Sequence, residues 1–195
     1  MYGKTRSGIG LPSLCDDEGI LLTKNGGGKY TDAALNGRLF TACNQAHVTT
    51  CTTDHATFTG LAIVNPTASG KNLIMHEFSY AMMDSPAADT NLSLMIGPIH
   101  TGYAADITVR STYWGHATSV AIADAAATIT AALGVIVKHI TTLGTNLTTD
   151  LLQGPTVVDL GGSIIVPPGY VIKTDTLLAS GDVMLFGFMW EEVSV

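Results

Sequence analysis

The fold is decided by the stretch Gly161-Gly162-Ser163-Ile164-Ile165-Val166-Pro167-Pro168-Gly169-Tyr170-Val171-Ile172. Two apolar runs of strand-forming residues flank the Pro-Pro-Gly sequence in its middle. Proline fixes φ near about −65° and glycine tolerates positive φ, so Pro168 and Gly169 fit the central positions of a type II turn. The stretch therefore predicts two strands joined by a tight turn.

A third apolar run, 183–192, follows after a segment that contains Thr and Gly. Side chains alternate between the two faces of a strand, so this run places Phe186, Phe188 and Trp190 on one side. A core strand in this position indicates that the end of the chain closes a β-sandwich or barrel.

Shorter strands are predicted upstream at 58–64, 72–80 and 90–96, and each is bounded by turn residues such as Asn65-Pro66 or Gly97-Pro98. This spacing is typical of an all-β, antiparallel β-sandwich. We expect the core or the assembly contacts to include Phe78, Leu94, Ile165, Val171, Phe186, Phe188 and Trp190.

Two other regions complete the predicted organisation. Residues 134–140 favour a strand, whereas 120–133 fit either a helix, from their alanines, or strands and loops. The glycine run at 25–28 indicates a linker, and Thr31 can cap a short helix over 32–35. We therefore expect an N-terminal arm or linker at 1–35 and one sandwich domain at 36–195. The first segment fits both an arm that docks on a neighbouring molecule and an ordinary mobile terminus.

Composition indicates a chain that buries much of its surface. Charged residues make up 13% and hydrophobic residues 46% of the chain, whose net charge is −7. Residues 39–195 hold four basic and twelve acidic residues, so we expect neither direct nucleic-acid binding nor attraction to an anionic membrane. The sequence shows neither a secretory signal nor a membrane-spanning segment, and its three cysteines are expected to be reduced.

Cys43, His47, Cys51 and His55 recur at every fourth residue, a pattern that suggests a zinc site at first sight. Steps of four residues span about 13 Å on a strand, which is too long for one tetrahedral zinc site. A loop could still bring two of these residues together, so the pattern leaves zinc binding open, and we expect no metal or other cofactor.

No pattern predicts catalysis. Lys29 and Lys71 follow glycines but lack the remaining residues of a phosphate-binding loop. The spacing of the histidines at 76, 100, 116 and 139 singles out no nucleophile or base, so we expect that the protein is not an enzyme. Exposed aromatic side chains can stack on sugar rings, which makes Tyr103, Tyr113 and Trp114 a candidate glycan-binding site.

A family resemblance agrees with the predicted architecture. The segment 165–170, followed by the Phe-x-Trp-Glu-Glu strand, resembles the closing hairpin of small jelly-roll virion proteins of tailed bacteriophages. Residues 36–45, 57–66 and 70–74 are similar to the opening of the same group, whereas 1–35 and about 110–155 lie outside the resemblance.

The resemblance implies a jelly-roll-like capsid decoration, cement or appendage protein that is assembled in the host cytoplasm and resides in the virion. It implies a homo-oligomer, often a trimer, with contacts to other virion proteins and no catalytic residues. We expect the N-terminal arm to make those contacts. The alternative is a receptor- or glycan-binding tip of a tail or head fibre.

Overall fold

The computed structural model describes residues 2–4, 10–12, 28–46, 48–49, 60–83, 89–99, 103–125, 134–144, 155–176 and 183–195. The chain divides into two compact units, Met1–Asp32 and Ala33–Val195. In the first unit, β1 (Tyr2–Lys4) and β2 (Gly10–Pro12) form an antiparallel pair. Part of the predicted strand at 58–64, and residues 126–133 of the ambiguous segment, lie outside the described residues.

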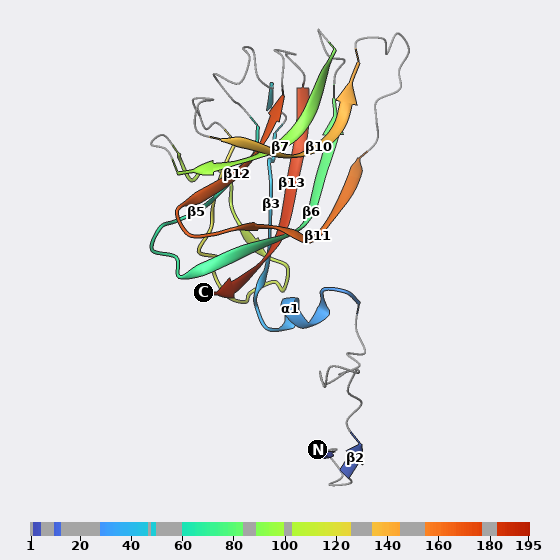
Figure 1. Cartoon of the computed structure of the whole chain (residues 1–195), viewed down its shortest axis with the longest axis vertical. Helices are drawn as coiled ribbons and strands as arrows, with labels where there is room; N and C mark the ends of the chain where they lie inside the picture. The colour runs from blue at the N-terminus through green and yellow to red at the C-terminus, as the bar shows by residue number, and fades with distance from the viewer. Residues whose placement is uncertain are drawn as a thin grey trace. The chain divides into compact units, whose positions relative to one another are not determined.

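The second unit is a sandwich of two antiparallel sheets, which confirms the predicted all-β class (Figure 1). One sheet has the order β11-β6-β13-β3-β8, with β4 also paired to β13, and the other has the order β10-β7-β12-β5-β9. The elements of this unit are α1 (Thr31–Leu35), which begins in the first unit, β3 (Leu39–Cys43), β4 (Val48–Thr49), β5 (Ala62–Asn65), β6 (Lys71–Met82), β7 (Thr90–Pro98), β8 (Arg110–Ser111), β9 (Ile122–Asp124), β10 (Val135–Leu143), β11 (Thr156–Val166), β12 (Tyr170–Thr176) and β13 (Val183–Ser194).

The strand pairing is that of a jelly roll. Eight of the strands pair in sequence order from the outside inwards, β3 with β13, β5 with β12, β6 with β11 and β7 with β10. A single long antiparallel ribbon with these four pairs, wrapped around a core, gives the two sheets of a jelly roll. The jelly-roll-like part of the prediction is therefore confirmed as well.

The turn at 167–170 connects the two sheets. Tyr170 N–H donates to Pro167 O at 3.2 Å and Gly169 has φ +86°, so the type II turn is confirmed. However, β11 and β12 belong to different sheets. The two strands therefore do not form the hairpin that the resemblance implied, because the Pro-Pro-Gly turn takes the chain across the sandwich.

The core lies between the sheets and is rich in aromatic side chains from β6 and β13. Phe186, Phe188 and Trp190 are buried on the inner face of β13, and the ring of Phe188 lies 4.9 Å from that of Phe78. Leu94 of β7 is also fully buried in this cluster. The alternation of β13 thus supplies one continuous apolar face.

Two residues of the expected core are placed differently. Ile165 is 53% exposed, so its assignment to the core is wrong; its neighbours Ile164 and Val166 face inwards instead. Val171 is buried, but it packs with Ala62 and Val64 on the outer face of the five-stranded sheet. In both cases a run of consecutive apolar residues conceals which face each side chain occupies.

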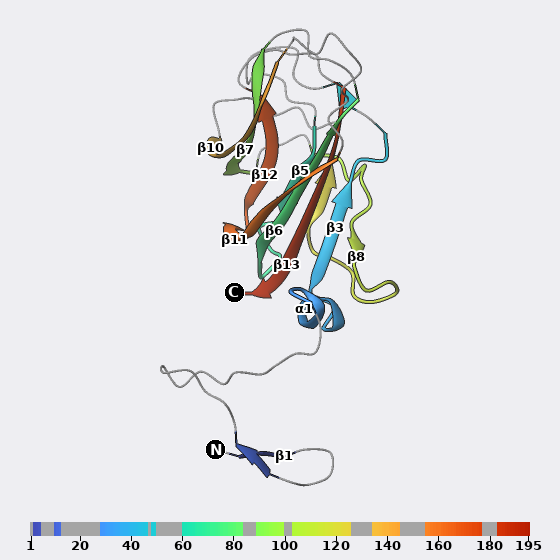
Figure 2. The same ribbon diagram turned by 90° about the vertical axis from the view of Figure 1, so that its right-hand side faces the viewer.

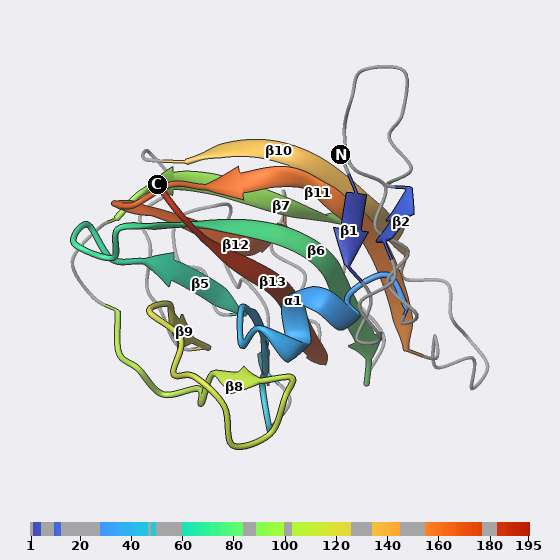
Figure 3. The ribbon, with the colours of Figure 1, turned by 90° about the horizontal axis from the view of Figure 1, so that it is seen from below.

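The described strands between β7 and β10 lie along one edge of the sandwich. Strand β8 pairs with β3 at the edge of one sheet, and β9 pairs with β5 at the edge of the other. Figure 3 shows β8 and β9 along one side of the sandwich and β10 and β11 along the opposite side. In the described part of the chain, no strand pairs with the outer edge of β10 or of β11.

Candidate binding site around Trp114

The candidate site is built on the short strand β8 and the turn that follows it. Arg110 and Ser111 pair with Thr41 and Phe40 of β3, which lies beside β8 in Figure 2. Thr112 continues the contact, because its N–H donates to Leu39 O at 3.0 Å. These backbone bonds fix the start of the turn to the edge of the sheet.

Trp114 stands at the tip of this turn. His116 N–H donates to Tyr113 O at 3.1 Å, and Gly115 has φ +86°, which fits the third position of a type II turn. The Trp114 side chain is 79% exposed, although tryptophan is usually largely buried. The guanidinium of Arg110 lies over its ring, 5.5 Å from the centroid, in a cation–π contact.

Two open pockets are both lined in part by Arg110 and Trp114. One has a volume of about 340 Å³ and is lined by Thr41, Cys43, Gln45, Thr108, Arg110 and Trp114. The other, of about 310 Å³, is lined by residues 109–111 and 114–119. We call the first the β3–β8 pocket; its lining is mostly polar side chains and includes no carboxylate.

Packing against Gly37 holds the end of the turn. The ring of His116 stacks on that of Tyr113, with centroids 4.9 Å apart. On its other side His116 lies so close to Gly37 that an added Cβ there would overlap the imidazole. Gly37 has φ +66° and ends α1, where its N–H donates to Ala34 O, so one glycine serves both the helix end and the turn.

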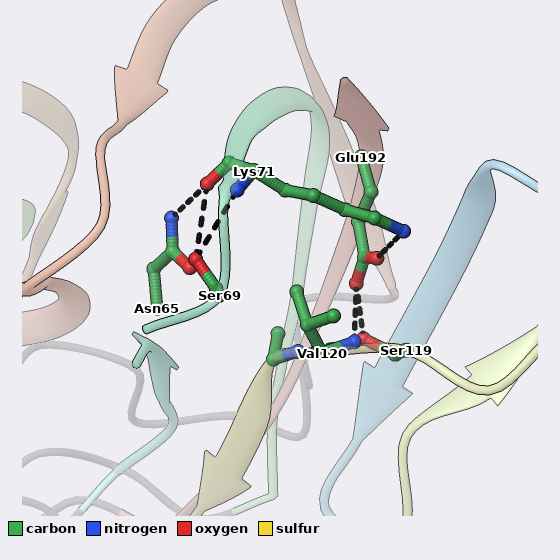
Figure 4. Close-up of polar contacts among 7 residues, drawn as sticks. Asn65, Ser69, Lys71, Ser119, Val120 and Glu192 are labelled. Atoms are coloured by element: carbon green, nitrogen blue, oxygen red, sulfur yellow. Dashed lines mark hydrogen bonds and ion pairs between the residues drawn. The ribbon is translucent and has the colours of Figure 1, made fainter. Parts of the chain in front are cut away.

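A buried carboxylate fixes the chain beyond the turn (Figure 4). Glu192 is fully buried, and its Oε1 accepts hydrogen bonds from Ser119 Oγ and from Val120 N–H. Its Oε2 lies 3.1 Å from Lys71 Nζ, which is 35% exposed on its side-chain atoms. The segment that carries Trp114 is thus tied to β13 and β6 within a few residues of the turn.

Asn65 braces the same end of the sandwich, as Figure 4 also shows. Its buried Nδ2 donates to the backbone carbonyls of Lys71, at 2.7 Å, and of Val166, at 2.9 Å. One side chain therefore joins β5 to the start of β6 and the end of β11, and it restrains the position of Lys71 beside Glu192.

The structure does not bring the three aromatic residues of the predicted glycan site together. Tyr113 and Trp114 lie in the same turn, but Tyr103 packs with Val64 and Val171 on the outer face of the other sheet. Grouping Tyr103 with them was therefore wrong. Arg110 and Gln45 also line the pocket, but no spacing pattern in the sequence connects them with Trp114, so neither is predicted from the sequence.

Histidine and cysteine side chains form no metal cluster in the part of the chain that is described. No group of three or more potential ligands occurs among those residues, which include Cys43 as an exposed free thiol but exclude His47, Cys51 and His55. His76 lies 3.4 Å from Glu191, and His139 Nδ1 lies 2.9 Å from Ser93 Oγ. His100 lies outside the described residues.

The site thus combines a flat, exposed aromatic ring, a cation and neutral polar groups on a braced frame, which suits binding of a small polar ligand. Comparison with known protein families, with characterised proteins and with solved structures gives no match. None of the helices among the described residues is long and apolar enough to cross a bilayer.

Proposed function

We propose that this chain is a structural component of a bacteriophage virion, a capsid decoration, cement or appendage protein that acts by assembling with copies of itself. The proposal rests on the resemblance of segments within 36–195, outside about 110–155, to jelly-roll virion proteins, and the jelly-roll strand order supports it. Its mechanism is burial of surface rather than a reaction.

The observation that carries self-assembly is a group of exposed aliphatic side chains at the edge formed by β10 and β11, with which no described strand pairs. Val135 and Val137 of β10, and Val157 and Ile165 of β11, are between 46% and 71% exposed. We call these four residues the β10–β11 rim. Long edge strands with apolar side chains are ready to pair with another chain unless something covers them. Copies of the same chain are the occupant that we propose.

The β10–β11 rim lies along one side of the sandwich, so copies of the chain can meet through it (Figure 3). The resemblance to jelly-roll virion proteins implies three copies, and repeated contacts between copies close into a ring when the rotation between them allows it. We propose a homotrimer on the basis of that resemblance, in which the segment 1–30 reaches other virion proteins.

Light scattering tests the assembly. The unmodified chain should have a mass of about three times 20.3 kDa, and the double variant Val135→Asp/Val157→Asp should be a folded monomer. Leu35→Asp is the matched control, because Leu35 is 61% exposed but lies on α1, outside the rim. A monomeric unmodified chain, or a double variant that keeps the full mass and a native circular dichroism spectrum, would contradict the rim as the interface.

Deleting residues 1–30 tests the arm separately. The truncated chain should keep the same number of subunits, because β1 and β2 pair only with each other among the described strands. It should no longer join virus particles in a reconstitution assay. Normal incorporation of the truncated protein would refute the proposed role of the arm.

A second candidate function is favoured by the exposed pair Arg110 and Trp114. A receptor- or glycan-binding tip protein needs an accessible aromatic ring on a rigid frame, and Trp114 provides one. This function predicts that Trp114→Ala keeps the oligomer and loses binding to host cells. Unchanged cell binding by a folded Trp114→Ala protein would exclude this candidate.

A further inference from the structure

We infer that the β3–β8 pocket binds a sugar unit that bears a carboxylate, such as a uronic acid or a nonulosonic acid of a surface polysaccharide. This inference rests on the second candidate function, glycan binding at Trp114, and goes beyond it by naming the chemical class of the ligand. Three features of the described residues carry it: the indole ring, the charge of Arg110 and the frame around them.

The indole of Trp114 provides the surface for a sugar ring. A pyranose packs the C–H groups of one face on an aromatic ring, while its hydroxyl groups remain free to make hydrogen bonds. Trp114 is exposed, lies at the tip of a turn and borders the pocket. Beside it, Thr41, Thr108 and Gln45 bring hydroxyl and amide groups to the pocket lining.

Arg110 supplies the selectivity for an anion. Among the described cations, Arg38 contacts Glu191 at 2.9 Å and Lys71 contacts Glu192 at 3.1 Å. Arg110 makes no ion pair with any described carboxylate, and its guanidinium lies over the ring of Trp114. A guanidinium binds a carboxylate through two parallel hydrogen bonds, so Arg110 is free to bind one on the ligand.

The charge of the surrounding chain strengthens this argument. The protein has a net charge of −7, which disfavours anionic ligands in general. The β3–β8 pocket nevertheless contains one cation and no acidic side chain. A neutral sugar would gain from the indole and the neutral polar side chains, whereas a carboxylated sugar would gain from the guanidinium as well.

The pocket is built on regular structure. Thr41 and Cys43 belong to β3, Arg110 belongs to β8, and the two strands are hydrogen-bonded to each other. Thr41 Oγ1 also donates to Phe188 O of β13 at 3.0 Å, so the floor of the pocket is fixed to the next strand. Groups held on strands lose little freedom when a ligand binds.

Tryptophan fluorescence can test the inference with matched ligands. The chain has two tryptophans, and Trp190 is fully buried, so a ligand-dependent change reports on Trp114. The probes are the methyl glycosides of galacturonic and glucuronic acid, each beside its neutral galactose or glucose counterpart, and N-acetylneuraminic acid. We expect saturable binding of at least one acid, about tenfold or more tighter than that of a neutral sugar.

Variants then separate the contributions of the two residues. Arg110→Gln should reduce affinity for the acid about tenfold or more and leave weak binding of neutral sugars unchanged. Trp114→Ala should abolish binding of both the acidic and the neutral sugars. Because this variant lacks the reporting tryptophan, its binding is measured by ligand-observed NMR. Lys138→Gln is the control, because it removes one positive charge on β10, at the opposite edge of the sandwich.

The outcomes are distinct. Equal binding of acidic and neutral sugars, or an Arg110→Gln protein with unchanged preference, would overturn the inference and leave glycan binding at Trp114 standing. Absence of binding to every probe would overturn both the inference and the second candidate function. Neither result would affect the assembly proposal, which is tested by mass.

Discussion

Replacing Glu192 should show how much the buried carboxylate stabilises the fold. Glu192→Ala removes the acceptor for Ser119 Oγ–H and Val120 N–H, and it removes the partner of Lys71. Hydrogen bonds to a charged group each contribute about 1.5–3 kcal/mol. Because Lys71 is about one third exposed, its ion pair is screened and adds about 0–1 kcal/mol. Together these contributions give an expected fall of about 3–7 kcal/mol in the free energy of unfolding.

The amide variant separates hydrogen bonding from charge. In Glu192→Gln the oxygen can still accept from Ser119 and Val120, while Lys71 turns its ammonium towards water. The loss should then be about 1–2 kcal/mol, and Lys71→Ala should cost less than about 1 kcal/mol. Ranked by stability loss, the order should be Glu192→Ala, Glu192→Gln and then Lys71→Ala.

Urea unfolding followed by far-UV circular dichroism measures these differences. Protein concentration must be the same throughout, because an oligomer's apparent stability depends on it. The urea concentration at the midpoint should be lowest for Glu192→Ala, higher for Glu192→Gln and highest of the three for Lys71→Ala. The slope of the unfolding free energy against urea concentration should be the same for all three. If Glu192→Ala lost less than about 1 kcal/mol, or lost no more than Glu192→Gln, the reasoning about the buried carboxylate would be refuted.

Three further substitutions test the packing. Phe188→Ala should cost about 3–5 kcal/mol in urea unfolding, because it leaves a cavity beside Phe78; a loss below about 1 kcal/mol would contradict the core assignment. Gly187→Ala should lower the free energy of unfolding by about 1–3 kcal/mol, because a Cβ there would lie 2.6 Å from Ser79 Oγ and 2.7 Å from Cys43 Sγ. An unchanged melting temperature would show that the strands can separate freely. Gly37→Ala should lower the free energy of unfolding by about 1–3 kcal/mol, because Gly37 has a positive φ. It should also shift the NMR resonances of His116, and unmoved resonances would argue against the contact between Gly37 and His116.

The sequence carried enough information to predict the sandwich. Pro168 and Gly169 define a turn by their backbone preferences alone, and the alternation of Phe186, Phe188 and Trp190 shows which face of β13 is buried. Both signals are local, so they do not depend on knowing the rest of the fold. Glu192 shares the face of Trp190, and that alternation could have identified it as a buried carboxylate.

The errors arose where local signals conflict or are missing. Ile164, Ile165 and Val166 are all apolar, so no alternation marks Ile165 as the exposed member. The preceding glycines, Gly161 and Gly162, have positive φ and lie where the register between β11 and β6 shifts, but the odd-numbered residues of β11 stay exposed on both sides of the shift. No local pattern in the sequence shows that the same face is kept across the two glycines.

The candidate site was harder to predict than the core. Tyr103 and Trp114 are close in sequence, but the segment that carries them crosses from the outer face of one sheet to the edge of the other. Arg110 meets Thr41 and Cys43 only because β8 pairs with β3, a contact between distant parts of the chain. Pairing of this kind is set by the whole topology and leaves no local pattern.

The central place of β13 also has a consequence for the rate of folding. This strand lies between β3 and β6, and its bond from Thr41 to Phe188 joins residues 147 positions apart. Closing so long a loop costs conformational entropy before the strand gains its contacts, so folding dominated by distant pairs is slow. Until β13 inserts, the facing edges of β3 and β6 are both open. Chaperone binding or aggregation should therefore compete with folding at that step.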